Sequence, residues 1–316
     1  MINVIVKMMI KQFQKHFTTS IKIADNSFLA VNWIQTFNEM INFQTGHNKI
    51  SVPEDLVLEN VTFKTSDNLN LVGIIYVANQ NVKKWIITTH GYSSSKLPAF
   101  YHAYFLAELG YNILAFDFRN HGDSDGLITS FGFSEVNDLI SASEFLISQY
   151  NAIEINYIGS SMGAFTINYL NATSFELLKN YNTKWIISDS SYNSAISVIE
   201  NLILNRFSKI NTTLLETIMN EIISVFKNDY NVDLFKLNFT NEYKNKSVPT
   251  LFIHAKDDAV VSFQDCVNMY EHKEKIDQLN INEIKLFEQA GHVRSQIVHY
   301  DEFVLCVKNF ISKYNN

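Results

Sequence analysis

The stretch that decides the fold lies near the middle of the chain and reads Ile153-Glu154-Ile155-Asn156-Tyr157-Ile158-Gly159-Ser160-Ser161-Met162-Gly163. Its first six residues form an apolar run that predicts a buried strand. The last five follow the pattern Gly-x-Ser-x-Gly, a tight turn between a strand and a helix that holds its central serine in a strained conformation. Only a side chain as small as glycine fits two positions before and two positions after that serine. We therefore expect Ser161 to project its hydroxyl above a sheet, where it can act as a nucleophile.

Segments with strand and helix character alternate on both sides of this stretch, from about residue 57 onward. This alternation is typical of an α/β protein whose mostly parallel central sheet is flanked by helices. The first two predicted strands are expected to form a hairpin. The predicted strands are 57–64, 69–77, 85–89, 111–116, 153–158, 184–188, 249–254 and 282–287, and the predicted helices are 99–109, 134–149, 162–170, 263–271 and 296–311.

A long insertion separates the predicted strands 184–188 and 249–254. Apolar side chains recur in it at helical intervals, which predicts two or more amphipathic helices. We expect residues 191–247 to form a helical cap over the site, inserted into an α/β core made of residues 51–190 and 248–316. Residues 1–50 are expected to be an N-terminal helical lead-in to that core.

The lead-in begins with an amphipathic pattern over residues 1–17, in which apolar side chains lie on one helical stripe and Lys7, Lys11 and Lys15 lie on another. The segment lacks the apolar stretch of about 20 residues that a membrane-spanning helix needs. It also shows no cleavage site for a signal peptidase. Two roles stay open: packing on the protein itself or on a partner subunit, which we prefer, and peripheral contact with a membrane surface.

The composition excludes several classes of protein. Of the 316 residues, 47% are hydrophobic and 18% are charged, which fits a folded globular protein rather than a disordered one. The net charge of -7 argues against a nucleic-acid partner, which requires a concentrated basic surface. The two cysteines, Cys266 and Cys306, belong to no metal-binding pattern, and we expect free thiols. So few cysteines favour a reducing compartment, so a cytoplasmic location is predicted.

A serine hydroxyl is a weak nucleophile at neutral pH and needs a general base and an acid that orients the base. Two later segments supply candidates, namely Ile253-His254-Ala255-Lys256-Asp257-Asp258-Ala259-Val260-Val261 and Gln289-Ala290-Gly291-His292. Together with the turn at Ser161, they resemble segments of the α/β-hydrolase superfamily, in its serine esterase, lysophospholipase and serine aminopeptidase-like branch. The resemblance covers roughly residues 57–316 and implies an α/β-hydrolase fold with a helical cap insertion.

In that family the acid follows a late strand and the histidine lies in a loop before the last helix, which implies His292 as the general base. The family's acid motif often reads His-Gly-x-x-Asp-x-x-Val. Aligned on His254, with alanine in place of the glycine, it implies Asp258 as the acid. Asp257 stays open as the alternative, because only one of two adjacent side chains can point to the histidine. Some family members place the acid at the position of Asp189, for which we expect a structural or pocket-lining role.

The tetrahedral intermediate of such a reaction needs donors for its oxyanion, and two backbone N–H groups can supply them. The resemblance implies Met162, directly after the nucleophile, and Tyr92, in a loop His90-Gly91-Tyr92 that resembles the family's His-Gly segment. Residues 117–124 also resemble a family loop, commonly written Asp-x-Arg-x-His-Gly-x-Ser. The charged residues of that loop are expected to hold it together rather than to take part in chemistry.

These residues predict an enzyme, a serine esterase that cleaves carboxylic esters through an acyl-enzyme on Ser161, with His292 as base and Asp258 as acid. No cofactor and no metal are expected. The expected substrate is a small-molecule ester or, given the apolar cap, an acyl lipid. Two alternatives stay open: an aminopeptidase or oligopeptidase of the same fold and, ranked below it, a catalytically silent binding protein. Because the base must be neutral, activity should fall as the pH drops through the ordinary histidine range near about 6.5.

Overall fold

The computed structural model describes residues 33–47, 49–207, 209–245 and 248–314, and within them the chain folds around an eight-stranded sheet. The strand order is β1-β2-β4-β3-β5-β6-β7-β8. β1 pairs with β2 and β2 pairs with β4 antiparallel, whereas every other neighbouring pair is parallel. The predicted mostly parallel sheet is therefore confirmed. The strands are β1 (Glu59–Lys64), β2 (Asn70–Tyr76), β3 (Lys84–Thr89), β4 (Asn112–Phe116), β5 (Glu154–Ser160), β6 (Ile186–Asp189), β7 (Thr250–Ala255) and β8 (Glu283–Phe287).

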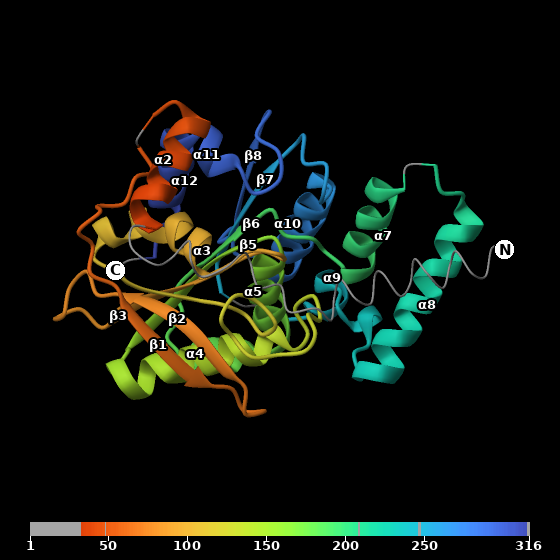
Figure 1. Cartoon of the computed structure of the whole chain (residues 1–316), viewed down its shortest axis with the longest axis horizontal. Helices are drawn as coiled ribbons and strands as arrows, with labels where there is room; N and C mark the ends of the chain where they lie inside the picture. The colour runs from red at the N-terminus through yellow and green to blue at the C-terminus, as the bar shows by residue number, and fades with distance from the viewer. Residues whose placement is uncertain (1–32, 48, 208, 246–247, 315–316) are drawn as a thin grey trace.

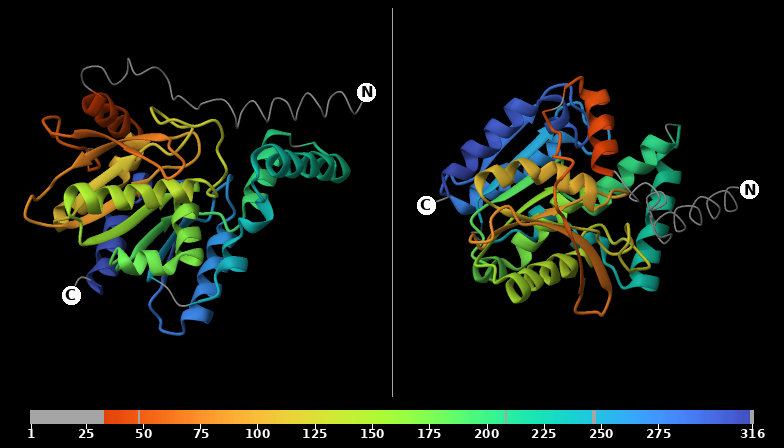
Figure 2. Two further views of the ribbon diagram at one scale, coloured as in Figure 1. Left: turned by 90° about the horizontal axis from the view of Figure 1, so that it is seen from below. Right: turned by 60° about the vertical axis from the view of Figure 1, so that its left-hand side comes forward.

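Helices cover both faces of this sheet (Figure 1). One face packs against α4 (Glu135–Tyr150), α5 (Met162–Thr173) and α10 (Phe263–Asp277), with the short α6 (Phe175–Asn180) after α5. The other face packs against α2 (Trp33–Thr45), α3 (Lys96–Ala103) and α12 (Tyr300–Ser312). The two layers are seen on opposite sides of the strands in Figure 2.

The central strands read as almost continuous apolar runs because both of their faces are buried. Successive side chains of a strand point to opposite faces. Ile87 accordingly packs in the cluster with α4 and α5, whereas the adjacent Ile86 packs in the cluster with α3 and α12. Both side chains are completely buried, so β3 lies at the centre of the molecule, between β4 and β5.

Two predicted helices differ from the observed ones. The predicted helix 99–109 begins earlier, at Lys96, because Pro98 is tolerated in a first helical turn, and it changes to a 3-10 helix, η2 (Tyr104–Leu109). The predicted helix 296–311 is divided into α11 (Ser295–Val298) and α12, with a non-helical backbone at His299. The ring of His299 stacks on Phe287, and its Nε2 lies 2.6 Å from the carbonyl oxygen of Glu288. These contacts with β8 and the residue after it explain the break.

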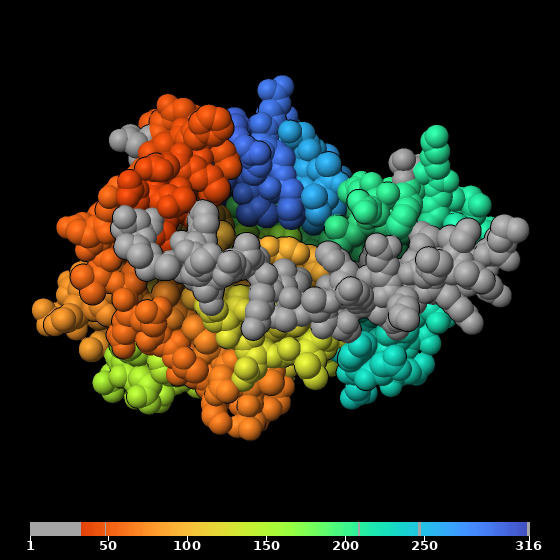
Figure 3. All heavy atoms as spheres, viewed as in Figure 1, coloured from red at the N-terminus to blue at the C-terminus, as the bar shows by residue number. Residues whose placement is uncertain are grey.

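The insertion between β6 and β7 contains α7 (Ala195–Arg206), α8 (Thr212–Tyr230), the 3-10 turn η3 (Leu234–Lys236) and α9 (Phe239–Glu242). Helices α7 and α8 lie beyond the sheet (Figure 1) and form a lobe at one end of the molecule (Figure 3). The short α9 returns the chain to the core, where it packs against α5 and α10. Phe226 of α8 contacts Phe131 of the core, with ring centroids 6.1 Å apart. The insertion is thus helical, and its buried apolar side chains belong to the same cluster as those of α4 and α5.

Three further expectations concern the N-terminal segment, the two cysteines and membrane-spanning helices. The predicted amphipathic helix at residues 1–17 lies outside the described residues. Cys266 and Cys306 are free thiols, the first buried and the second partly exposed. Among the described helices, none combines the length and apolar character needed to cross a membrane.

Candidate active site

Ser161 occupies the turn between β5 and α5. Its backbone has φ 50° and ψ -115°, a positive φ that residues with a side chain seldom adopt. The N–H of Ser161 donates to the carbonyl oxygen of Asp189, at the end of β6, across 2.9 Å. A Cβ added at Gly159 or Gly163 would lie 2.5 or 2.6 Å from the Thr89 Oγ1 atom, so glycine is required at both positions. The sequence pattern of the turn is thus explained by the close approach of β3.

Three residues that are far apart in the sequence meet at this turn. The Ser161 Oγ atom lies 3.0 Å from His292 Nε2, and His292 Nδ1 lies 2.7 Å from Asp258 Oδ2. Asp258 follows β7 and His292 follows β8, so all three side chains lie at the carboxyl ends of parallel strands. A carboxylate only accepts hydrogen bonds, so the proton of a neutral His292 ring is on Nδ1. The lone pair of Nε2 then faces the hydroxyl of Ser161.

The carboxylate of Asp258 is buried and fully hydrogen-bonded. Its Oδ1 accepts the backbone N–H groups of Val260 and Val261 at 2.8 and 3.0 Å, and its Oδ2 also lies 3.0 Å from His254 Nε2. Burial raises the pKa of Asp258, but the interactions with His254 and His292 together lower it by a larger amount. The pKa of Asp258 therefore lies below its ordinary value. Asp258 therefore stays ionised while it holds His292.

The two alternative acids have other partners. Asp257 is exposed, and its Oδ1 accepts the N–H groups of Ala290 and Gly291 at 2.9 and 3.0 Å. These hydrogen bonds lower the pKa of Asp257, and the hydrogen bond from Gly291 has the larger effect. Asp189 is completely buried, and its Oδ2 lies 3.1 Å from the Nε2 atom of His102. Asp257 thus fastens the loop that carries the histidine, and Asp258 is the residue of the three that contacts the ring of His292.

The loop after His292 is tied to the end of β6. The N–H of Val293 donates to Ser190 Oγ at 3.2 Å, and Ser190 Oγ–H donates to Asp189 Oδ1 at 3.0 Å. Val293 has φ 55°, a costly conformation for a β-branched residue. The sequence reasoning missed this connection, because nothing in the local pattern marks Ser190 as a partner of residue 293.

The two expected oxyanion donors lie on either side of Ser161. Met162 is the first residue of α5, where backbone N–H groups have no acceptor within the helix. Tyr92 follows Gly91, and a Cβ added at Gly91 would lie 3.2 Å from Ser161 Cβ, so this loop packs directly on Ser161. The Tyr92 ring stacks on Phe131, with centroids 5.8 Å apart and an interplanar angle of 20°. Both positions are consistent with backbone donors beside Ser161.

The loop 117–124 is held by buried ion pairs. Lys96 Nζ lies 2.6 Å from Asp117 and 2.8 Å from Asp123, and the guanidinium of Arg119 binds both carboxylate oxygens of Asp138. The Nε2 atom of His90 accepts the N–H of Phe118 at 3.0 Å, which joins this loop to the loop before Tyr92. The charged residues of the loop 117–124 are thus paired with one another or with neighbouring elements, and these contacts hold the loop in place.

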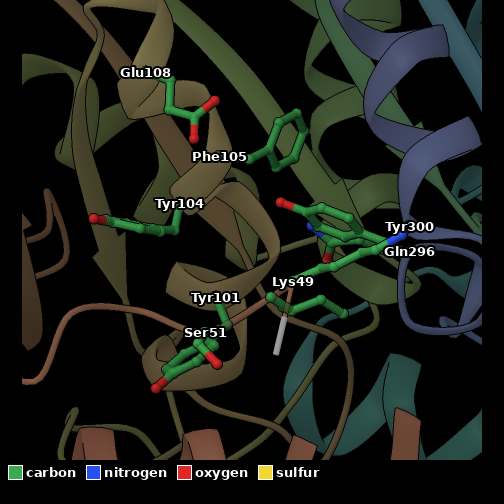
Figure 4. Close-up of a pocket in the computed structure, with 9 residues that line it drawn as sticks. Lys49, Ser51, Tyr101, Tyr104, Phe105, Glu108, Gln296 and Tyr300 are labelled. Carbon is green, nitrogen blue, oxygen red and sulfur yellow. The ribbon is translucent and has the colours of Figure 1, made fainter. Parts of the chain in front are cut away.

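A small pocket lies elsewhere, between the segment 49–51, helices α3 and η2, and helices α11 and α12 (Figure 4). Its lining includes Lys49, Tyr104, Glu108 and Tyr300, and it includes none of Ser161, Asp258 and His292. Within the described ranges, no group of three or more His, Cys, Asp or Glu side chains is arranged to hold a metal ion.

A search of known proteins finds likenesses that agree with this architecture. A family model described as "alpha/beta hydrolase fold" matches residues 84–180. The uncharacterized protein YqkD of Bacillus subtilis (strain 168) is 36% identical over 92 residues, so the match spans 29% of this chain and 30% of that protein.

Among solved structures, the esterase Pf2001 of Pyrococcus furiosus has a TM-score of 0.63 and 26% identity, over 83% of this chain and 94% of that one. The alpha/beta hydrolase GrgF of Penicillium sp. sh18 has a TM-score of 0.60 and 17% identity, over 82% of this chain and 99% of that one, a likeness of fold. The family model covers the turn at Ser161, and these folds match over most of their lengths, so the chain is a member of the α/β-hydrolase superfamily.

Proposed function

We propose that this protein is a serine hydrolase that cleaves carboxylic esters. The observation that carries the proposal is the unbroken chain of hydrogen bonds from Ser161 Oγ to His292 and from His292 to the buried carboxylate of Asp258. A nucleophile within 3.0 Å of a base, and a base oriented by an ionised acid, are the arrangement that serine acyl transfer requires. The likeness to the Pyrococcus furiosus esterase supports an ester as the substrate.

In the proposed reaction, Ser161 Oγ attacks the ester carbonyl carbon while its proton passes to His292 Nε2. The N–H groups of Met162 and Tyr92 bind the oxyanion that forms. The C–O bond to the alcohol then breaks, the alcohol leaves with the proton from His292, and the acyl group remains on Ser161. A water molecule, deprotonated by His292, then attacks the acyl carbon. The bond from that carbon to Ser161 Oγ breaks, His292 returns the proton to Ser161, and the carboxylic acid is released. Asp258 keeps the proton of neutral His292 on Nδ1 throughout and stabilises the charged ring.

Residues 191–247 are proposed to act as the cap of this site, over a core of residues 51–190 and 248–316. The aromatic contact between Phe226 of α8 and Phe131 supports this, because Phe131 also stacks on Tyr92 beside the nucleophile. An aromatic boundary of this kind suits an apolar acyl group. A panel of p-nitrophenyl esters of increasing chain length tests it, and a strong preference for the acetyl ester would exclude an acyl-lipid substrate. Peptide substrates assayed beside the esters test the aminopeptidase alternative.

A fluorophosphonate probe, which reacts with activated serines, tests the assignment of Ser161. The wild-type chain should be labelled and Ser161→Ala should not. Ser160→Ala is the matched control, because Ser160 is an equally buried neighbouring serine that belongs to β5. Labelling that persists in Ser161→Ala would refute the proposed nucleophile. A wild-type chain that neither reacts with the probe nor cleaves esters would favour the silent binding protein.

A further inference from the structure

A second histidine contacts the acid of the proposed triad. His254 lies on β7, four residues before Asp258, and its side chain is completely buried. Its Nε2 lies 3.0 Å from Asp258 Oδ2 and 3.1 Å from the carbonyl oxygen of Val261. The Oδ2 atom of Asp258 is therefore shared between two imidazole rings, those of His254 and His292.

The partners of His254 define its tautomer. A carboxylate oxygen and a carbonyl oxygen only accept hydrogen bonds, so Nε2 must carry the proton that both receive. The other ring nitrogen, Nδ1, is buried and has no hydrogen-bond partner among the residues that the structure describes. A proton there would be a buried donor without an acceptor, which is unfavourable. His254 is therefore a neutral ring that donates from Nε2.

This donor completes the hydrogen bonding of the Asp258 carboxylate. Oδ1 receives two backbone N–H groups, from Val260 and Val261, and Oδ2 receives the Nδ1–H of His292 and also lies 3.0 Å from His254 Nε2, whose N–H faces both Oδ2 and the carbonyl oxygen of Val261. With Oδ1 and Oδ2 fixed from both sides, the carboxylate cannot rotate about its χ2 bond without breaking several charge-assisted hydrogen bonds. If His254 did not donate, Oδ2 would be held by His292 alone, the ring that it has to orient.

We propose that His254 is a positioning residue of this site, which fixes Asp258 so that Asp258 can hold His292 against Ser161. The inference rests on the proposed serine hydrolase function. Within the part of the chain that the structure describes, the polar partners of His254 are Asp258 and Val261 rather than Ser161 or His292, so His254 acts through the carboxylate. Its bond to Val261 fastens the loop 255–261, so a purely structural role is the competing explanation.

Two readouts on the full chain separate these explanations. Ring nitrogen chemical shifts of ¹⁵N-labelled histidines report the tautomer of His254, and the downfield N–H proton of His292 reports its hydrogen bond to Asp258. The rate of fluorophosphonate labelling reports how well Ser161 is activated. His254→Phe keeps a ring of similar size without a donor, and His254→Gln keeps a donor that can reach the same oxygen. Thr250→Val, which removes a buried polar group at the other end of β7, is the control.

We expect a neutral ring protonated at Nε2 for His254 in the wild-type chain. In His254→Phe the downfield proton should shift or broaden and labelling should slow by about tenfold, the effect of one hydrogen bond to a charged group. His254→Gln should regain labelling to within about threefold of wild type, and Thr250→Val should match wild type.

A His254 ring protonated at Nδ1 would overturn the proposal. So would a His254→Phe variant with an unchanged His292 signal, or a His254→Gln variant as slow as His254→Phe. If His254→Phe does not fold, His254→Gln decides, because a folded His254→Gln variant that is labelled more than about tenfold more slowly than wild type would overturn the proposal. If the wild-type chain is not labelled at all, the hydrolase proposal fails, while the ring signals still test the contact between His254 and Asp258.

Discussion

Replacing Asp257 and Asp258, one at a time, by asparagine tests which of the two adjacent aspartates orients His292. Asp258 accepts two backbone N–H groups at Oδ1 and the ring of His292 at Oδ2, where His254 Nε2 also lies within 3.0 Å, whereas Asp257 accepts two backbone N–H groups at Oδ1. An asparagine side chain has one acceptor oxygen and one amide group that only donates. The two substitutions are chemically identical and differ only in the partners that they meet.

In Asp258→Asn, the oxygen is expected to stay on the N–H groups of Val260 and Val261, which leaves the amide group facing the two rings. His292 must then accept at Nδ1 and carry its proton on Nε2, where it can no longer take the proton of Ser161. A wrong tautomer of this kind costs about 10³- to 10⁴-fold in kcat in serine hydrolases. In Asp257→Asn, the remaining oxygen can still accept from Ala290 and Gly291, so we expect kcat within about threefold of wild type.

The assay is hydrolysis of a p-nitrophenyl ester at pH 8, with the rate of fluorophosphonate labelling as a measure that does not depend on the choice of ester. Unfolding by urea confirms that both variants are folded. The reasoning is refuted if Asp258→Asn keeps more than about a tenth of the wild-type kcat, or if Asp257→Asn is the more damaged of the two.

Three other perturbations have expected outcomes. Gly163→Ala would place a Cβ 2.7 Å from two backbone carbonyl oxygens of β3 and its following loop, so we expect a loss of about 3 kcal/mol in the free energy of unfolding, measured in urea, and wild-type stability would contradict this packing. Ser190→Ala removes the acceptor of the Val293 N–H, so it should cost about 1 kcal/mol and slow probe labelling; a variant unchanged in both would show that the contact is dispensable. The pKa of Asp258 is lower in the folded chain than its unfolded value of about 3.9, so its contribution to stability is present above that pH and is lost below it. The stability deficit of Asp258→Asn should therefore shrink as the pH falls from 6 to 3, and a constant deficit in urea unfolding would contradict this assignment.

The sequence was sufficient to predict features whose cause is local. The apolar run before Gly159 predicts β5, and the two glycines around Ser161 predict the turn, because a side chain at either position would collide with β3. The order of the segments that contain Asp258 and His292 predicted residues that the structure brings together with Ser161. The motif aligned on His254 favoured Asp258 over Asp257 but left Asp257 open, since a difference of one residue in a loop changes the direction of a side chain without changing the composition of the segment.

Contacts between distant residues could not be predicted in this way. The break at His299 depends on its stacking with Phe287, and a helical pattern in the sequence continues across it. The pair of His102 with Asp189 joins residues 87 positions apart, and neither belongs to a spacing pattern. His254 was visible in the sequence as part of a motif, but its contact with the carboxylate depends on the path of the loop 255–261.

The end of β6 shows why a buried aspartate can be essential to this arrangement without being the acid. The backbone carbonyl oxygen of Asp189 accepts the N–H of Ser161, whose backbone has a positive φ. The Oδ1 atom of Asp189 accepts a hydrogen bond from the hydroxyl of Ser190, and the Ser190 Oγ atom accepts the N–H of Val293, which follows His292. The Oδ2 atom of Asp189 faces His102. Both oxygens of Asp189 thus have partners other than His292, and Asp258 is the aspartate that contacts the ring of His292. Asp189 instead joins the strand that carries the nucleophile to the loop that carries the base, so that a shift of either one must disturb the other.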